Sequence, residues 1–422
     1  MTQYVTLWTL IFATLVLLYT GLRLWLDARQ MRHVAQHRAS VPAPFAQHVE
    51  LAAHQKAADY TRAKLRLGTL ELVWSQLCLL GWTLLGGLHA VNTGLLDLMG
   101  PGLWQSLALF AAVGWIQSLL DLPLSWWRTF RLEAAYGFNR STVGLWLGDL
   151  VKGWVMGAVV MAPLAALVLW LMDQSGNLWW LYAWAAWVGF SLLMLIIYPT
   201  WIAPRFNNFE PLANTTLSTA VTDLMRRCGF AAKGLYVMDG SKRSAHANAY
   251  FTGLGKSKRV VFYDTLIARL SQGEMLAVLA HELGHFKRGH VPKRMITLFG
   301  SGLLALLALS WLAQQPWFYL GLGVMPNLEG SNSALALILF FMVAPMLTLL
   351  ITPWMSARSR RDEFEADAYA AEHAQAQDLG HALVKLYKDN ASTLTPDPIY
   401  VRFFYSHPPA LQRLERLNVA LA

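Results

Sequence analysis

Seven long apolar stretches, separated by polar segments, dominate the pattern of this chain. Each is close to 20 residues long, enough for a helix to cross about 30 Å of hydrocarbon. The first begins near Met1 and lacks a small-residue cleavage site, so we expect a retained span and not a signal peptide. The pattern predicts a mainly α-helical membrane protein with seven spans, at about 5–26, 68–90, 102–127, 153–172, 178–199, 295–314 and 334–353.

The positive charges predict how these spans are oriented. All 34 Lys and Arg fall in four segments, 23–66, 128–152, 201–294 and 358–416. Seven crossings place these four segments on one side of the membrane, and the positive-inside rule makes that side cytoplasmic. We therefore expect the N-terminus outside. We also expect the basic surface to contact anionic membrane lipids and not nucleic acid.

The composition agrees with a membrane protein. Hydrophobic residues make up 55% of the chain and charged residues 14%, against roughly a quarter charged in an ordinary soluble domain. So little charge is insufficient to cover the surface of a soluble multi-domain enzyme, and the high hydrophobicity excludes a disordered chain. Two cysteines, Cys78 and Cys228, exclude a disulfide scaffold and a cysteine-only metal site.

The chain divides into four regions by this pattern. Residues 1–200 form the N-terminal membrane region with five spans, and 295–353 form a transmembrane hairpin. The polar segments 201–294 and 354–422 are long enough to build one compact cytoplasmic domain in two parts.

The first polar segment reads as a small α+β unit. An amphipathic helix at 213–229 precedes β-type runs at 235–238, 249–252 and 259–263, and a hairpin turn is expected at 253–258. A helix then begins at Ser271, which with Glu274 forms a capping box, and continues with helical spacing to His290.

This last helix carries a candidate metal site. His281 and His285 lie at positions i and i+4 of His-Glu-Leu-Gly-His, so their imidazoles share one helix face and can bind one ion. Zinc accepts two neutral imidazoles and needs a third protein ligand. Glu282 follows the first histidine, which places its carboxylate where it can take a proton from the attacking water.

The third ligand is expected in the second polar segment. Glu363 and Asp367 share a helical face in Arg-Asp-Glu-Phe-Glu-Ala-Asp, and we assign Glu363 as the ligand and Asp367 as the acceptor that orients a ligand histidine. Spacing alone fits equally a solvent-facing, charge-rich helix start. Two spans separate His285 from Glu363, so both lie on the same side of the membrane. His290, placed about 140° around the helix from His285, is expected not to be a ligand.

At this point the residues resemble a known family, the type I CAAX prenyl proteases, which are integral-membrane zinc endopeptidases. The likeness covers residues 128–422. It rests on His-Glu-Leu-Gly-His at 281–285, Glu-Phe-Glu-Ala-Asp at 363–367 and Tyr-Ser-His-Pro-Pro at 405–409, with further matches at 137–139, 202–204, 246–250 and 258–264. Position 365 is Glu, where Gln is common in relatives.

The resemblance implies a barrel of seven transmembrane helices around a water-filled chamber, closed on the cytoplasmic side by the zinc domain. It implies one Zn²⁺ held by His281, His285 and Glu363. It also implies that His407 stabilises the oxyanion, although its sequence context alone fits a surface residue equally well. Arg413 is then a nearby supporting cation.

By the same resemblance, Asn248, Ala249 and Tyr250 form the edge strand that binds a peptide or protein substrate, possibly lipidated. An exposed strand edge can pair with an extended peptide and fix the register of the scissile bond.

Two rival functions fit parts of the pattern. A membrane quality-control protease without a prenyl substrate would use the same site. A transporter or channel with a structural zinc site would need charges deep within the spans, and the one Lys or Arg inside a span, Arg23, lies near the end of the first. The compact length and the lack of a dilysine-type C-terminal signal favour a bacterial inner-membrane protein, in which the natural substrate need not be prenylated.

Overall fold

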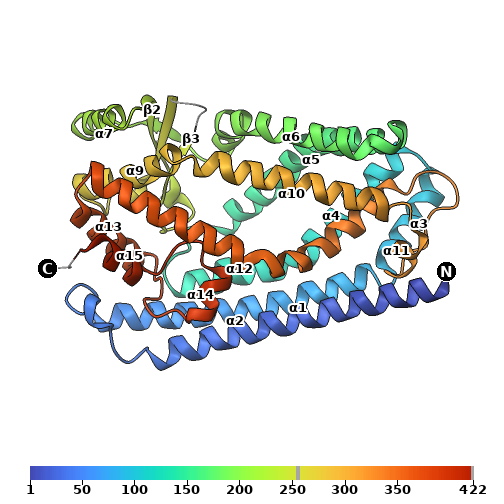
Figure 1. Cartoon of the computed structure of the whole chain (residues 1–422), viewed down its shortest axis with the longest axis horizontal. Coiled ribbons are helices and arrows are strands. Elements are labelled where there is room, and N and C mark those ends of the chain that lie inside the picture. Colours follow the sequence, from blue (N-terminus) through green and yellow to red (C-terminus); the bar gives the residue numbers. More distant parts are fainter. Residues whose placement is uncertain (253–256, 420–422) are drawn as a thin grey trace.

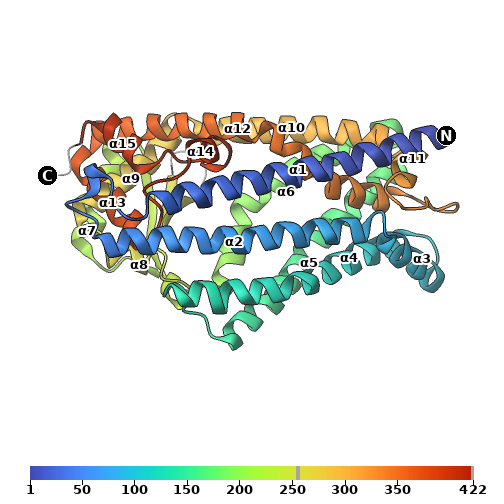
Figure 2. The same ribbon diagram turned by 90° about the horizontal axis from the view of Figure 1, so that it is seen from below.

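Long, nearly parallel helices form most of the molecule (Figures 1 and 2). The computed structural model describes residues 1–252 and 257–419. Six helices have the length and hydropathy of a membrane span. They are α1 (Thr2–Gln36), α4 with a π-helical end (Leu103–Glu133), α5 (Val143–Gln174), α6 with its π- and 3-10-helical end (Gly176–Arg205), α10 (His290–Leu312) and α12 (Ser333–His373).

A seventh span is a bent pair of helices. α2 (Leu51–Trp82) and α3 (Gly87–Met99) pass the span criteria together and meet at 47°. Gly86 adopts a positive φ of 81° at the bend, a conformation that glycine reaches without steric cost. The polytopic helical fold is thus confirmed, with six spans or seven if the pair counts as one. The predicted span at 68–90 crosses this bend.

The distal end of the bundle, near the N-terminus, is closed by a packed apolar core. The buried residues of several spans gather there, including Phe12, Trp82, Leu109 and Leu169. Short helix α11 (Pro316–Leu320) adds Phe318 and Tyr319 to the same core. Helix α11 lies at one end of the bundle, and the soluble domain, formed by residues 209–252, 257–289 and 354–419, lies at the other (Figure 1).

Between that core and the soluble domain, four of the helices have long stretches without a fully buried side chain. No residue is buried over 110–127 of α4, 143–168 of α5, 184–197 of α6 or 291–308 of α10, stretches that the structure describes completely. A helix in a close-packed bundle buries one face along its whole length. Side chains along these stretches are therefore less closely packed than those of the apolar core.

The soluble domain contains a four-stranded sheet in the order β1-β2-β4-β3. The strands are β1 (Phe209–Pro211), β2 (Ala231–Met238), β3 (Ala249–Thr252) and β4 (Ser257–Tyr263). β2 and β4 are parallel, whereas β1 and β3 are antiparallel to their neighbours. The α+β prediction is confirmed, β1 was missed, and the predicted turn at 253–258 falls largely outside the described residues.

Helices cover the sheet and complete this domain. They are α7 (Thr215–Arg227), α8 (Asp264–Ile267), α9 (Gln272–Lys287), α13 (Ala376–Asp389), α14 (Pro398–Phe404) and α15 (Ala410–Leu417). The predicted capping box at the start of α9 is present, with Ser271 and Glu274 each accepting the other's backbone N–H. Burial alone would raise the pKa of Glu274. The ion pair with Lys385 and the hydrogen bonds of the cap outweigh this effect, so the pKa lies below its ordinary value.

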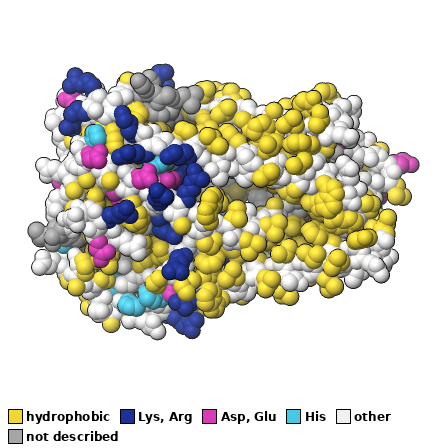
Figure 3. All heavy atoms as spheres, viewed as in Figure 1, with side chains coloured by type: hydrophobic (Ala, Val, Ile, Leu, Met, Phe, Trp, Pro, Cys, Tyr) yellow, Lys and Arg dark blue, Asp and Glu magenta, His cyan; other side chains and the backbone are white. Residues whose placement is uncertain are grey.

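Charge is distributed unevenly over the surface. Figure 3 shows Lys and Arg gathered around the soluble domain, whereas hydrophobic side chains cover the rest of this face. Exposed apolar residues such as Leu193, Ile196 and Leu350 belong to the spans. A surface of this kind is stable in lipid and not in water, which confirms a multi-pass integral membrane protein.

Candidate active site

Two helices from distant parts of the chain cross closely at the site. α9 carries His-Glu-Leu-Gly-His, and the C-terminal half of α12 carries Glu363. Gly284 permits the approach, because a Cβ at this position would lie 3.1 Å from both Ala366 Cα and Tyr369 Cβ. Any side chain at this position would require α12 to shift away from α9.

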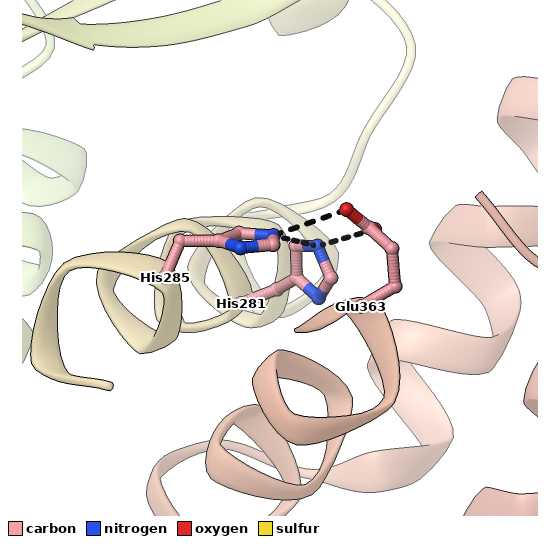
Figure 4. Close-up of side chains that lie close together, drawn as sticks. All are labelled: His281, His285 and Glu363. Carbon is pink, nitrogen blue, oxygen red and sulfur yellow. Dashed lines mark hydrogen bonds and ion pairs between the residues drawn. The ribbon is translucent and has the colours of Figure 1, made fainter. Parts of the chain in front are cut away.

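His281, His285 and Glu363 point toward one another from these two helices (Figure 4). The Nε2 atoms of the histidines are 3.3 Å apart, and each lies 3.3 Å from a different carboxylate oxygen of Glu363. A tetrahedral ion with ligand distances of about 2.1 Å requires ligand atoms roughly 3.4 Å apart. The three side chains therefore have the spacing of a zinc site.

The chemistry of these atoms also fits a cation. Among the described residues, Oε2 of Glu363 is a buried oxygen without a hydrogen-bond partner. A buried carboxylate oxygen without a donor is costly unless a cation neutralises it. Two imidazole Nε2 atoms and this carboxylate form the donor set of a catalytic zinc site that keeps a fourth position open.

Asp367 fixes the orientation of the first histidine. Its Oδ1 is 2.8 Å from Nδ1 of His281. A carboxylate only accepts hydrogen bonds, so the imidazole donates from Nδ1 and its Nε2 lone pair faces the site.

Arg413, from α15, supports Asp367 in turn. Its Nε donates to Oδ2 of Asp367 over 2.8 Å, and both side chains are buried. Burial alone would lower the pKa of the Arg413 guanidinium. The ion pair with Asp367 outweighs this effect, so the pKa lies above its ordinary value. The structure therefore places Arg413 behind Asp367 and beside His281.

The second histidine is oriented by His290, which sequence reasoning did not identify. His290 Nε2 lies 3.2 Å from Oε2 of Glu365, and His290 Nδ1 lies 3.0 Å from Nδ1 of His285. Because the carboxylate accepts, His290 donates from Nε2 and accepts at Nδ1 from His285. Glu365 is thus connected to the site through an imidazole, and His285 also presents Nε2.

The expected continuous helix to His290 was wrong. α9 ends at Lys287, Gly289 takes a positive φ of 68°, and His290 begins α10. This break folds His290 back over His285, where a continuous helix would have placed it about 140° away. The glycine between Arg288 and His290 was the available signal, since a helix commonly ends at a glycine in the left-handed region.

Replacing His290 with Leu is expected to weaken zinc binding by about 10- to 100-fold, because Nδ1–H of His285 loses its acceptor. His290→Gln keeps an acceptor oxygen and should retain most of the affinity. Zinc competition with a chromophoric chelator measures both variants. Equal affinity for the wild type and His290→Leu would contradict this role.

A cavity of about 550 Å³ opens at this site, and His281 is the one of the three candidate ligands that lines it. Glu282, His407, Asn248 and Ala249 are among its lining residues. The His407 side chain is 64% exposed, and its Nε2 lies 3.5 Å from Oε1 of Glu363. The predicted base, the predicted oxyanion donor and the start of the predicted substrate strand thus face one space.

The strand that we expect to bind substrate, β3, is an edge strand, because it lies last in the sheet order. Its residues divide between two cavities. Asn248 and Ala249 line the cavity beside the histidines, whereas Tyr250 lines a separate cavity of about 310 Å³. Asn390 was missed by sequence reasoning. Its Oδ1 lies 3.1 Å from Nδ1 of His246, in the loop that leads to β3.

Two family models match consecutive parts of the chain. The model for the N-terminal, five-helix membrane region of CAAX prenyl proteases matches residues 30–208. The model for peptidase family M48 matches residues 211–420.

Individual proteins show the same relationship. CAAX prenyl protease 1 of Saccharomyces cerevisiae is 31% identical over 440 residues, a match that covers 97% of this chain and 95% of that one. The Arabidopsis thaliana homolog is 35% identical over 317 residues, covering 74% and 73% of the two chains. Both of these relatives are eukaryotic, so they lend no support to a bacterial source, which stays a prediction.

A solved structure extends the likeness to the whole fold. The crystal structure of S. mikatae Ste24p superposes with a TM-score of 0.90 at 29% identity, and the match covers 97% of this chain and 98% of that one. Together with the His-His-Glu cluster, these findings show that the chain belongs to the CAAX prenyl protease 1 family and is a membrane zinc metalloendopeptidase of peptidase family M48.

Proposed function

We propose that this protein hydrolyses peptide bonds of prenylated proteins at the cytoplasmic membrane face, with one Zn²⁺ held by His281, His285 and Glu363. The observation that carries the proposal is the cluster of two Nε2 atoms 3.3 Å apart, each 3.3 Å from an oxygen of Glu363, beside a cavity of about 550 Å³. Zinc bound there supplies Lewis-acid polarisation and lowers the pKa of water to about 7.

Glu282 is the proposed general base. It follows His281 on α9 and lines the same cavity. There its carboxylate accepts a proton from the attacking water and passes it to the leaving amine. A general base in this position typically contributes 10²- to 10⁴-fold to the rate.

The substrate backbone is proposed to add to the free edge of β3. An extended peptide on this edge forms main-chain hydrogen bonds, which fix the scissile carbonyl in register. Asn248 and Ala249 line the same cavity as His281 and Glu282, which supports binding of the scissile carbonyl at this end of the strand.

His407 is proposed to donate to the oxyanion that develops during attack. Its imidazole projects into the cavity, and Ser406 Oγ lies 3.0 Å from its Nδ1. One such donor is typically worth about 3 kcal/mol of transition-state stabilisation. Arg413 is bound to Asp367 and also lines the cavity, so we propose that it positions His281 through Asp367.

The topology supports a cytoplasmic site. The basic residues surround the soluble domain (Figure 3), as the positive-inside rule requires for the cytoplasmic face. We propose that the N-terminus lies outside. We also keep the division into a membrane region to residue 200, a hairpin at 295–353 and a two-part metalloprotease domain, although α12 continues unbroken through residue 353.

Cleavage of matched peptides tests this function. The purified protein is expected to cleave a farnesylated CAAX peptide between the modified cysteine and the next residue, and a zinc chelator should abolish the cleavage. Product mapping by mass spectrometry gives the site. If the unlipidated peptide is cleaved equally well, the protein is a membrane peptidase without a prenyl requirement; cleavage that survives the chelator contradicts the zinc mechanism.

A further inference from the structure

The cavity of about 310 Å³ lies on the opposite face of the sheet from the zinc helix. Side chains alternate between the two faces of a strand. In β4, Val260 and Phe262 are fully buried in the core that contains α9 residues, whereas Arg259 and Val261 line the cavity. In β3, Phe251 packs on that same core, and Tyr250 faces the cavity.

The cavity adjoins the proposed substrate edge. Tyr250 and Thr252 of β3 both line it. Strand residues rise by about 3.3 Å each, so Thr252 lies only about 10 Å along the edge from Ala249 in the zinc cavity. A peptide paired with β3 therefore places its side chains alternately toward the zinc cavity and toward this second cavity.

The cavity also lies at the membrane border. Pro199 and Pro204, at the cytoplasmic end of α6, form part of its wall. Beside them, Trp201 is 57% exposed and Arg205 lies over its ring at 4.8 Å from the centroid. Exposed Trp residues with a neighbouring cation are typical of the membrane–water interface, so an apolar group can enter this cavity from the lipid side.

The lining suits a hydrocarbon chain. It includes the rings of Phe209, Tyr236 and Tyr250 and the aliphatic Val261. Arg259, the one charged residue of the lining in the described part of the chain, lies 6.0 Å from the centroid of the Tyr236 ring. Burial raises the pKa of Tyr250 to about 12. A volume of about 310 Å³ lies in the range of small-molecule sites.

We propose that this cavity binds the isoprenoid group of a prenylated substrate while the substrate backbone pairs with β3. The proposal rests on the proposed function and adds the location of the lipid. The apolar chain leaves the cysteine near the zinc cavity, passes the edge of the sheet and occupies the aromatic cavity on its other face.

A filling substitution tests the site in the full-length protein. Val261→Phe projects a larger side chain into the cavity from β4, one strand away from the substrate edge, and Val261→Ile is the matched control. The substrates are two peptides of one CAAX sequence, one with a farnesyl and one with a methyl thioether. Val261→Phe should raise KM for the farnesylated peptide about tenfold or more, the scale of a steric misfit in an apolar pocket.

The other measurements in this experiment discriminate between explanations. For Val261→Phe, two values should stay within about twofold of wild type: kcat on the farnesylated peptide and KM for the methyl thioether peptide. For Val261→Ile, kcat and KM on both peptides should stay within the same range. An unchanged KM for the farnesylated peptide, or an equal rise for both peptides, overturns the proposal. A wild type that cleaves both peptides equally well also overturns it but leaves the zinc peptidase intact, whereas a wild type that cleaves neither contradicts the proposed function itself.

Photocrosslinking provides a second test that needs no cavity variant. A farnesyl peptide with a photoreactive group at the chain terminus is bound to the Glu282→Gln variant, irradiated and mapped by mass spectrometry. Labels should fall on the cavity residues Phe209, Tyr236, Tyr250 or Val261. Labels confined to the transmembrane helices, or to surface positions that added phospholipid protects, overturn the proposal.

Discussion

Glu282→Gln is expected to lose peptide cleavage by about 10²- to 10⁴-fold, the range that a general base supplies, while zinc stays bound. Gln has the size of Glu but cannot take a proton from water. The three ligand atoms, from His281, His285 and Glu363, do not involve this side chain. We therefore expect kcat to fall with little change in KM, as for a group that acts in the transition state.

Zinc content and cleavage must be measured on the same preparation of this variant. Elemental analysis should give about one zinc per chain for both wild type and Glu282→Gln. Near-wild-type cleavage by the variant would remove Glu282 from the mechanism. Loss of zinc together with activity would instead assign Glu282 to metal binding.

Glu363→Ala is expected to abolish both zinc binding and cleavage. It removes the one ligand that α12 contributes and leaves two imidazoles of α9, which alone cannot complete a zinc site. Loss of an outer-shell partner already costs about 10- to 100-fold in metal affinity, so loss of a ligand should cost more. Zinc per chain after dialysis and the chelator-competition affinity are the measurements.

Glu372→Ala is the matched control for this substitution. Glu372 belongs to the same helix but is exposed and is not part of the metal-ligand cluster. It should keep full zinc content and activity. Full zinc occupancy in Glu363→Ala would show that the third ligand lies elsewhere.

Features that depend on local pattern were predictable from the sequence. The apolar stretches give the spans, the i, i+4 spacing gives His281 and His285, and the Ser271–Glu274 pair gives the start of α9, because each signal depends on neighbouring positions. Glu363 required more. Its spacing fitted a solvent-facing helix equally well, and the family resemblance favoured its assignment as a ligand.

Features that depend on the meeting of distant segments were not predictable. The contact of His290 with His285 depends on a helix break at Gly289, and the contact of Asn390 with His246 joins residues far apart in the chain. The separate cavity at Tyr250 depends on how the end of α6 closes over the sheet. Such arrangements follow from tertiary packing, which periodicity does not encode.

The close crossing of α9 and α12 connects these observations. Gly284 lets the helices touch at Ala366 and Tyr369, and Asp367, one turn after Glu363, then reaches His281. One crossing therefore brings together a ligand and the group that orients another ligand. The transmembrane hairpin before Glu363 returns the chain to the side of the membrane where α9 lies.

Anomalous diffraction at the zinc absorption edge, from crystals of the wild-type protein, is the sharpest test of the zinc assignment. We expect a single strong peak about 2.0–2.2 Å from Nε2 of His281, Nε2 of His285 and a carboxylate oxygen of Glu363. The fourth position should be filled by water or substrate. The absence of a peak between these residues, or a peak held by other side chains, would contradict the assignment.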